Sequence, residues 1–181
     1  MAAGGCVVAW NGTEGTVEVF GGNVLRTLGY TDAGKRKLYP EEVLYLLYTD
    51  TCEVLDGTTR GRSFSYGDGV KSLLSPRTDL TAQRWFVYLS IKERNYPVFR
   101  TEHRVNSQYA ASICCKDFVV YGKSSVFKLS GPPKPIYQVS IEPKRGILKT
   151  VPDTEIPMLF CVCEGRDVVF LSITESVLET P

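Results

Sequence analysis

Metal-binding residues are scarce in this sequence of 181 residues. It has a single histidine, His103, and its six cysteines include no Cys-x-x-C spacing. A structural zinc site takes four closely spaced cysteine or histidine ligands, so the sequence predicts no metal site, and no pattern in it points to a cofactor.

Long apolar runs are also missing. No run approaches the ~20 residues that a membrane-spanning helix needs, and residues 1–5 are small and uncharged, unlike a signal peptide. We therefore expect no membrane span and a soluble, intracellular protein. Its cysteines should be reduced and mostly buried, because an intracellular chain of this size needs no disulfide framework.

Neither sign of charge dominates, since 21 Lys and Arg residues stand against 20 Asp and Glu residues. Nucleic-acid binding would therefore have to come from local basic patches or from a larger assembly. Hydrophobic residues make up 43% of the chain, which is enough for one compact body or two subdomains.

The most informative stretch is residues 26–48, RTLGYTDAGKRKLYPEEVLYLLY, where a basic segment runs into an apolar helix. Pro40 suits the first helical position, and Glu41 and Glu42 place negative charge at the positive end of the helix dipole. Residues 43–48 leave almost no polar face, so this helix must be covered on nearly all sides.

Turn residues and periodicity predict further elements in the N-terminal half. They are a hairpin over 6–10 and 16–20, a strand over 51–55, a small helix capped by Ser65 and Asp68, a helix over 80–94 capped by Thr78 or Asp79 and stopped at Asn95, and a strand over 96–100. The C-terminal half is β-rich, with predicted strands over 118–121, 136–141, 158–163 and 167–173.

These elements predict an α+β fold. We expect an N-terminal β-hairpin and small helical subdomain with a β-wing over residues 1–100, a connector over 101–115, and a C-terminal mixed β-sheet domain over 116–181.

Residues 26–47 resemble the N-terminal region of the large non-catalytic subunit of eukaryotic tRNA-splicing endonuclease, the Sen-fifty-four type. Its pattern is R-T-x-G-aromatic, a basic step, then P-E-E-x-L-Y-L-L. Three further segments are similar to later parts of that family: LTAQRWFVYLSIKERNYPVFR, DFVVYGKSSVFKLSGPPKPIYQVSI and IPMLFCVCEGRDVVFLSI. The resemblance implies a nuclear protein and a C-terminal domain of the tRNA-intron endonuclease type. The long charged insertion usual in the family is replaced here by a short connection between Arg100 and Cys115.

Catalytic members of the family cleave RNA without metal, using a Tyr, a His and a Lys around the scissile phosphate. Tyr121 matches the tyrosine. Residues 134–136, Lys-Pro-Ile, stand where the histidine is expected and contain no histidine. Residues 155–157, Glu-Ile-Pro, stand where the lysine is expected and contain no lysine. The resemblance therefore implies a degenerate nuclease domain with no catalytic residues, in which Tyr121 is a vestigial match that packs or forms an interface.

The family resemblance also implies partners: a catalytic sister subunit, the other subunits of a heteromeric tRNA-splicing complex, and precursor tRNA. The RNA-binding candidates are basic residues: Arg26, Lys35, Arg36, Lys37, Lys144 and Arg145. The partner-interface candidates are apolar residues of the last two predicted strands: Met158, Phe160, Val162, Val168, Phe170 and Leu171.

Three alternatives stay open at this point. The basic run at residues 35–37 is equally well explained as a solvated turn before a helix. The chain could be a self-sufficient RNA endonuclease that uses Tyr121, His103 and Lys123 or Lys128. It could also be a winged-helix nucleic-acid-binding module unrelated to splicing.

Overall fold

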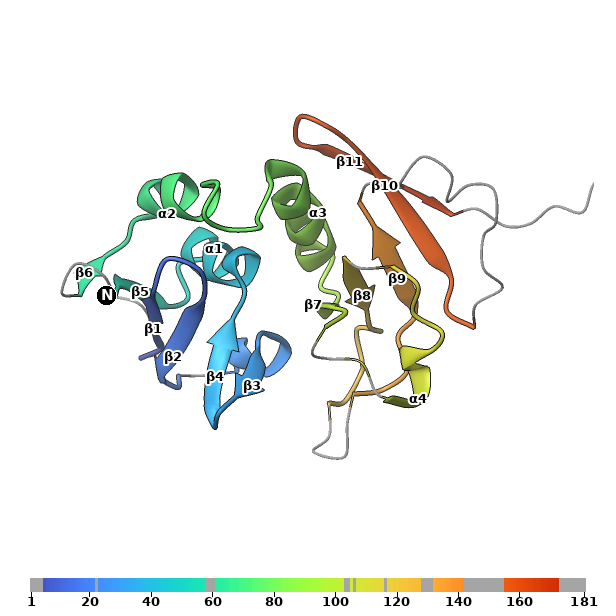
Figure 1. Cartoon of the computed structure of the whole chain (residues 1–181), viewed down its shortest axis with the longest axis horizontal. Coiled ribbons are helices and arrows are strands. Elements are labelled where there is room, and N and C mark those ends of the chain that lie inside the picture. The colour runs from blue at the N-terminus through green and yellow to red at the C-terminus, as the bar shows by residue number, and fades with distance from the viewer. Residues whose placement is uncertain are drawn as a thin grey trace, which may run out of the picture. The chain divides into compact units, whose positions relative to one another are not determined.

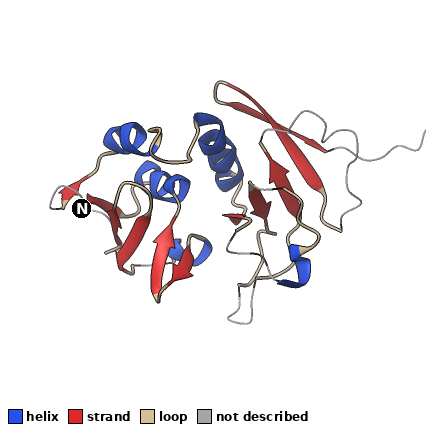
Figure 2. Ribbon diagram, in the orientation of Figure 1, coloured by secondary structure: helices blue, strands red, loops and turns tan. Residues whose placement is uncertain are grey.

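The computed structural model describes the chain over residues 5–21, 23–57, 61–102, 105, 107–115, 117–127, 132–141 and 155–172. The chain divides into two compact units, Met1–Leu89 and Ser90–Pro181. Each unit contains a β-sheet with helices, as the secondary-structure colouring in Figure 2 shows. The expected α+β class is therefore confirmed. The boundary between the units falls inside α3 (Ala82–Glu93).

The first unit is built on a six-stranded sheet of order β3-β4-β2-β1-β5-β6 (Figure 1). Its strands are β1 (Val7–Trp10), β2 (Gly15–Val19), β3 (Tyr30–Asp32), β4 (Lys35–Leu38), β5 (Glu53–Asp56) and β6 (Arg62–Ser63). The β1–β2 hairpin is present as predicted, but it forms the centre of a mixed sheet because β5 returns parallel to β1. This half is thus a sheet covered by helices, which differs from the expected helical subdomain.

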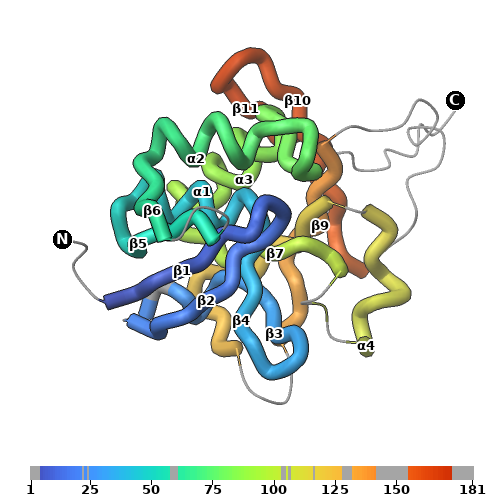
Figure 3. The backbone as a smooth tube through the Cα atoms, turned by 60° about the vertical axis from the view of Figure 1, so that its left-hand side comes forward, coloured from blue at the N-terminus to red at the C-terminus, as the bar shows by residue number. Residues whose placement is uncertain are grey.

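Two helices pack in layers on this sheet. The chain reaches α1 (Pro40–Tyr48) after a short 3-10 turn, η1 (Val24–Thr27), and the β3–β4 hairpin, and α2 (Tyr66–Leu73) follows β6. Figures 1 and 3 both show α1 next to the sheet and α2 beyond it. Val43, Leu44 and Leu46 are fully buried, as the apolar helix predicted, but Tyr48 at its C-terminal end is 46% exposed, so the helix is covered less completely than expected. The Ser65–Asp68 capping box at the start of α2 is also confirmed.

Helix α3 is capped differently from the expectation. The hydroxyl of Thr81 accepts from the backbone N–H of Arg84 at 3.1 Å, so Thr81 caps the helix in place of Thr78 or Asp79. The predicted stop at Asn95 is confirmed: this residue has a φ of 62°, in the left-handed region that ends many helices.

The second unit contains a five-stranded sheet of order β11-β10-β9-β8-β7. Its strands are β7 (Val98–Arg100), β8 (Phe118–Val120), β9 (Tyr137–Ser140), β10 (Met158–Glu164) and β11 (Asp167–Ser172), and a short helix, α4 (Ser107–Ala110), precedes β8. All four C-terminal strands occur where the sequence predicted them. The strand expected as a β-wing, β7, instead pairs with β8 as one of the two outer strands of this sheet.

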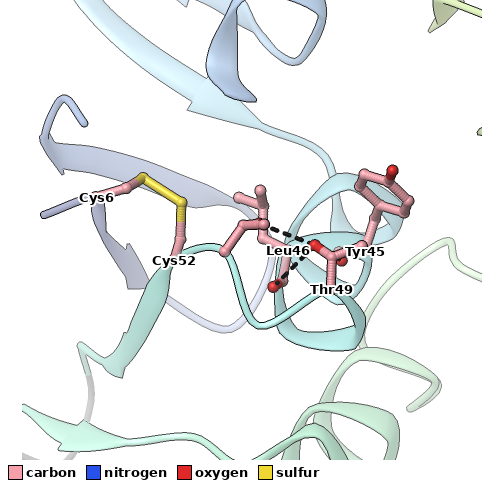
Figure 4. Close-up of a disulfide and its surroundings, with 6 residues drawn as sticks. Cys6, Tyr45, Leu46, Thr49 and Cys52 are labelled. Atoms are coloured by element: carbon pink, nitrogen blue, oxygen red, sulfur yellow. Dashed lines mark hydrogen bonds between the residues drawn. A yellow bond between two sulfur atoms is a disulfide. The ribbon is translucent and has the colours of Figure 1, made fainter. Parts of the chain in front are cut away.

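The expectation that all cysteines are reduced is wrong for one pair. Cys6, just before β1, and Cys52, just before β5, form a buried disulfide (Figure 4). The backbone N–H of Glu53 donates to the carbonyl of Cys6 at 3.0 Å, so the disulfide and the strand pairing join the same two segments. Thr49, drawn beside the disulfide, donates its hydroxyl hydrogen to the carbonyl of Tyr45 at 2.9 Å where α1 ends.

Candidate functional site

The basic segment of the first unit is a β-hairpin, not a loop. β3 and β4 pair antiparallel, with Asp32 opposite Lys35 across a two-residue turn. The turn residues Ala33 and Gly34 both have positive φ, 46° and 76°, which is the backbone of the tight turns that match the twist of a hairpin. The hairpin therefore places residues 35–37 on a strand, where alternate side chains point to opposite faces.

Arg36 and Lys37 are used inside the fold. The Arg36 guanidinium donates to the carbonyl of Leu25 at 3.1 Å and also to that of Leu28. The Lys37 ammonium forms an ion pair with Glu14, which directly precedes the neighbouring strand β2. The Lys37 side chain is only 16% exposed. Of the predicted RNA-binding residues, these two are thus committed to internal contacts.

The ion pair is part of a small polar cluster. The Tyr30 hydroxyl also donates to Glu14, at 3.0 Å. The hydrogen bond from Lys37 lowers the pKa of Glu14, and the hydrogen bond from Tyr30 lowers it further. Burial acts in the opposite direction but does not outweigh them. Burial, together with the hydrogen bond to Glu14, raises the pKa of Tyr30 to about 12. Glu14 therefore stays ionised at neutral pH and stabilises the hairpin.

Arg26 and Lys35 remain as the exposed members of the predicted RNA-binding set. Arg26 lies in η1 and Lys35 at the tip of the hairpin. Lys144 and Arg145 lie outside the described residues, as does His103. The candidate RNA surface of this unit is therefore smaller than the sequence suggested.

The start of α1 holds the turn that precedes the hairpin. One oxygen of the buried Glu42 carboxylate accepts from the backbone N–H of Gly29 at 2.6 Å, and the other accepts from that of Tyr39 at 2.9 Å. Gly29 has a φ of 68°, and a Cβ there would lie 2.2 Å from the carbonyl oxygen of Lys37. Only glycine fits this position. The sequence predicted Glu42 only as a partner of the helix dipole and missed this longer-range contact.

Tyr121 follows β8 and is fully buried. Its ring makes edge-to-face contacts with Phe99 and Phe127, at centroid distances of 5.8 and 5.2 Å. Aromatic pairs in this geometry stabilise a core beyond their area of contact. The structure thus places Tyr121 in a packing cluster of the second unit. Of the residues named for the nuclease alternative, only Lys123 is described besides Tyr121, and its ammonium lies 4.8 Å from the ring centroid of Tyr96.

The predicted partner interface separates into two parts. Met158 and Phe160 are buried in a cluster with Cys115, so they are core residues and their assignment to an interface is wrong. Val162 and Leu171 are exposed, at 55% and 47%. The other two candidates, Val168 and Phe170, are half-buried.

Strand register shows one residue that the sequence analysis missed. Val169 lies opposite Val162 in the β10–β11 hairpin and is 54% exposed. Directly opposed residues share a face of an antiparallel pair, and so do residues two apart along a strand. Val162, Val169 and Leu171 therefore form one exposed apolar patch on β10 and β11, which we call the hairpin patch. β11 is also an outer strand of its sheet, at the opposite end from β7.

Gln138 is a second residue that sequence analysis missed. It is fully buried on β9, where its amide oxygen accepts from the backbone N–H groups of Cys114 and Cys115 at 2.9 and 3.2 Å. Its amide nitrogen donates to the carbonyls of Ser112 and Ile156. This side chain attaches two loops to the sheet. The available signal in the sequence was a polar residue inside a β-rich run.

The four cysteines outside the disulfide are thiols. Burial raises the pKa of Cys115 to about 11 and that of Cys161 to about 12, so neither is a ready nucleophile or metal ligand at neutral pH. In the part of the chain that the structure describes, no group of three His, Cys, Asp or Glu side chains is placed to hold a metal ion. None of the helices described here has the length and apolar character needed to cross a membrane.

Comparison with known proteins identifies no relative, because no family model and no curated protein matches the chain.

Proposed function

We propose that this chain is a non-catalytic structural subunit of a tRNA-splicing endonuclease, which holds a catalytic sister subunit and helps to position precursor tRNA for intron excision. The proposal begins from the resemblance of residues 26–47 to that family. It is supported by the way the motif is built, since Glu42 of the P-E-E step bonds to Gly29 of the R-T-x-G turn. The two parts of the motif are therefore physically coupled and form one structural unit.

The observation that carries the non-catalytic part is the burial of Tyr121. A general base must come within hydrogen-bond reach of the proton that it removes. The Tyr121 ring is enclosed by Phe99 and Phe127 and has no exposed surface. It would reach a ribose 2′-hydroxyl only if this aromatic cluster opened.

The partner surface that we propose is the hairpin patch together with the outer edge of β11, which pairs with no further strand among the described residues. An outer strand offers backbone N–H and C=O groups that a partner strand can pair with, and the neighbouring apolar side chains add area and specificity. Such pairing suits a scaffold subunit because it needs no catalytic group from this chain.

The activity test is cleavage of an intron-containing precursor tRNA by the purified chain, alone and in complex with co-expressed catalytic subunits. We expect no cleavage by the chain alone, and cleavage by the complex that Tyr121→Phe leaves within about twofold, since loss of a catalytic proton-transfer group would typically cost 10²-fold or more. Cleavage by the chain alone that is lost in Tyr121→Phe would refute the proposal.

The assembly test is capture of the catalytic subunit by variants of this chain. Val169→Lys places a charge on the hairpin patch and should weaken capture at least tenfold. Val126→Lys is the matched control, because Val126 is another exposed valine, at 68% against 54% for Val169, and lies on a loop of the same unit. Equal capture by the two variants would show that the hairpin patch is not the partner surface.

A further inference from the structure

The second unit contains a small apolar cavity of about 110 Å³ between its sheet and the last turn of α3. Its floor is formed by Ile91, Val120 and Val139, which are at most 4% exposed. Tyr137 and Phe170 contribute partly exposed walls, so the cavity opens to solvent on a side lined by aromatic rings. An open apolar cavity of this kind is a typical binding site for an apolar group.

Two cations lie over aromatic rings that line the cavity. The Arg94 guanidinium carbon is 5.9 Å from the ring centroid of Phe170, and the Lys123 ammonium is 4.8 Å from that of Tyr96. Arg94 is oriented by its Nη1, which donates to the Ser90 carbonyl at 2.7 Å. Among the described residues, neither cation is in an ion pair with a carboxylate.

We propose that this cavity is a docking site for a partner polypeptide that inserts one large apolar side chain, of leucine or phenylalanine size. An acidic residue next to it in the partner meets Arg94 and Lys123. The apolar floor selects the inserted side chain, and the two cations select the charge of the flanking residue. Phe170 lies on the opposite face of β11 from Val169 and Leu171, so the cavity does not use the hairpin patch, and the proposal holds whether or not the chain belongs to a splicing complex.

The size of the cavity favours a side chain over a free small molecule. An apolar cavity of ~150 Å³ is known to accept benzene, so a cavity somewhat smaller holds about one such side chain. A free ligand this small gains little contact with which to offset its lost translational and rotational freedom. For a side chain on a polypeptide, every other contact of the partner helps to offset the same loss.

The lining also favours a peptide over a nucleotide, although cations and aromatic rings occur in sites for both. A nucleobase that entered the cavity would bury N–H and C=O groups against Ile91, Val120 and Val139, whose side chains offer no hydrogen-bond partner. An aliphatic or benzyl side chain has no polar group to leave unpaired.

The test is a titration of the full chain with synthetic pentapeptides, followed by methyl NMR of Ile91, Val120, Val139 and Leu159, which line the cavity. The probe is acetyl-DEFDE-amide. Acetyl-DESDE-amide removes the apolar side chain, acetyl-KKFKK-amide reverses the charge, and adenosine monophosphate represents a nucleotide. We expect saturable shifts of the cavity methyl groups with the first probe, and affinity at least tenfold lower for each of the others.

Arg94→Glu should lower the affinity for the acidic probe at least tenfold. Arg166→Glu makes the same charge change at another exposed arginine of this unit, in the turn between β10 and β11, and should leave the affinity within twofold. Both substituted arginines are exposed, so the fold should persist, and the methyl spectrum of each free variant verifies this. The proposal is overturned if the serine probe binds as well as the phenylalanine probe, if both variants bind alike, if adenosine monophosphate binds more tightly, or if no probe shifts the cavity methyl groups.

Discussion

Opening the Cys6–Cys52 disulfide should destabilise the first unit by about 4 kcal/mol. The two cysteines are 46 residues apart in sequence, and the loop between them contains β2, the β3–β4 hairpin and α1. In the chain-entropy treatment, a cross-link that closes a loop of this length removes roughly 13 cal/mol/K from the unfolded ensemble, or about 4 kcal/mol at 25 °C. Since domains of this size are commonly stable by only about 5–15 kcal/mol, the loss should be readily measured.

The assay is urea unfolding followed by tryptophan fluorescence. The only tryptophans, Trp10 and Trp85, are both buried in the first unit, so their emission follows that unit. The protein prepared without reductant is compared with the same protein after reduction and with the double variant Cys6→Ala/Cys52→Ala. Both changes should lower the urea midpoint to a similar extent.

Thiol counting in urea gives an independent check on the pairing. The unreduced protein should show four reactive thiols, from the four free cysteines, and six after reduction. Cys163→Ala is the control, because it removes a free, partly exposed thiol of the second unit and should leave the tryptophan transition unchanged. Six reactive thiols before reduction, or a double variant with the wild-type midpoint, would refute the reasoning.

Three other predictions concern the first unit. Leu44→Ala should lower its free energy of unfolding by ~2 to 5 kcal/mol, because the side chain is fully buried in α1; an unchanged thermal melt would contradict this. The depressed pKa of Glu14 means that its ion pair with Lys37 stabilises the fold above the ordinary carboxyl pKa, 4.5, and that this stability is lost as the pH falls through the folded-state pKa. Glu14→Gln should therefore flatten the dependence of the free energy of unfolding on pH below 4.5. An identical pH dependence in the variant would argue against the pair. Ala substitution of Arg26 and Lys35 should weaken precursor-tRNA binding and reduce its dependence on salt, which a binding titration at several salt concentrations measures; an unchanged salt slope would remove them from the RNA surface.

Local chemistry made many elements predictable. Pro40, the Ser65–Asp68 pair and Asn95 act on the backbone within one turn of themselves, so their effects do not depend on the rest of the fold. The short β-branched and aromatic runs of the C-terminal half likewise placed four strands where they occur. These signals lie within a few residues of one another, and such signals are the ones a sequence shows directly.

Contacts between distant segments were not predictable in this way. The role of a basic residue depends on what the fold places beside it. Arg36 and Lys37 were predicted as an RNA-binding patch, but carbonyls at and just after η1 and the carboxylate of Glu14 accept their hydrogen bonds. The same reason explains why Met158 and Phe160, expected at an interface, are buried against Cys115. Strand periodicity shows which residues share a face of the sheet, but it does not show which face is covered.

The sequence by itself determined the α+β class, the buried helix α1 and most strand positions, because periodicity and capping are local. Only the tertiary structure decided that β5 returns beside β1, that β7 belongs to the second sheet, and that Cys6 meets Cys52. It also decided which charged and apolar residues remain at the surface. These outcomes depend on which distant segments gain most by burying one another, and that balance is set by the whole chain rather than by any stretch of it.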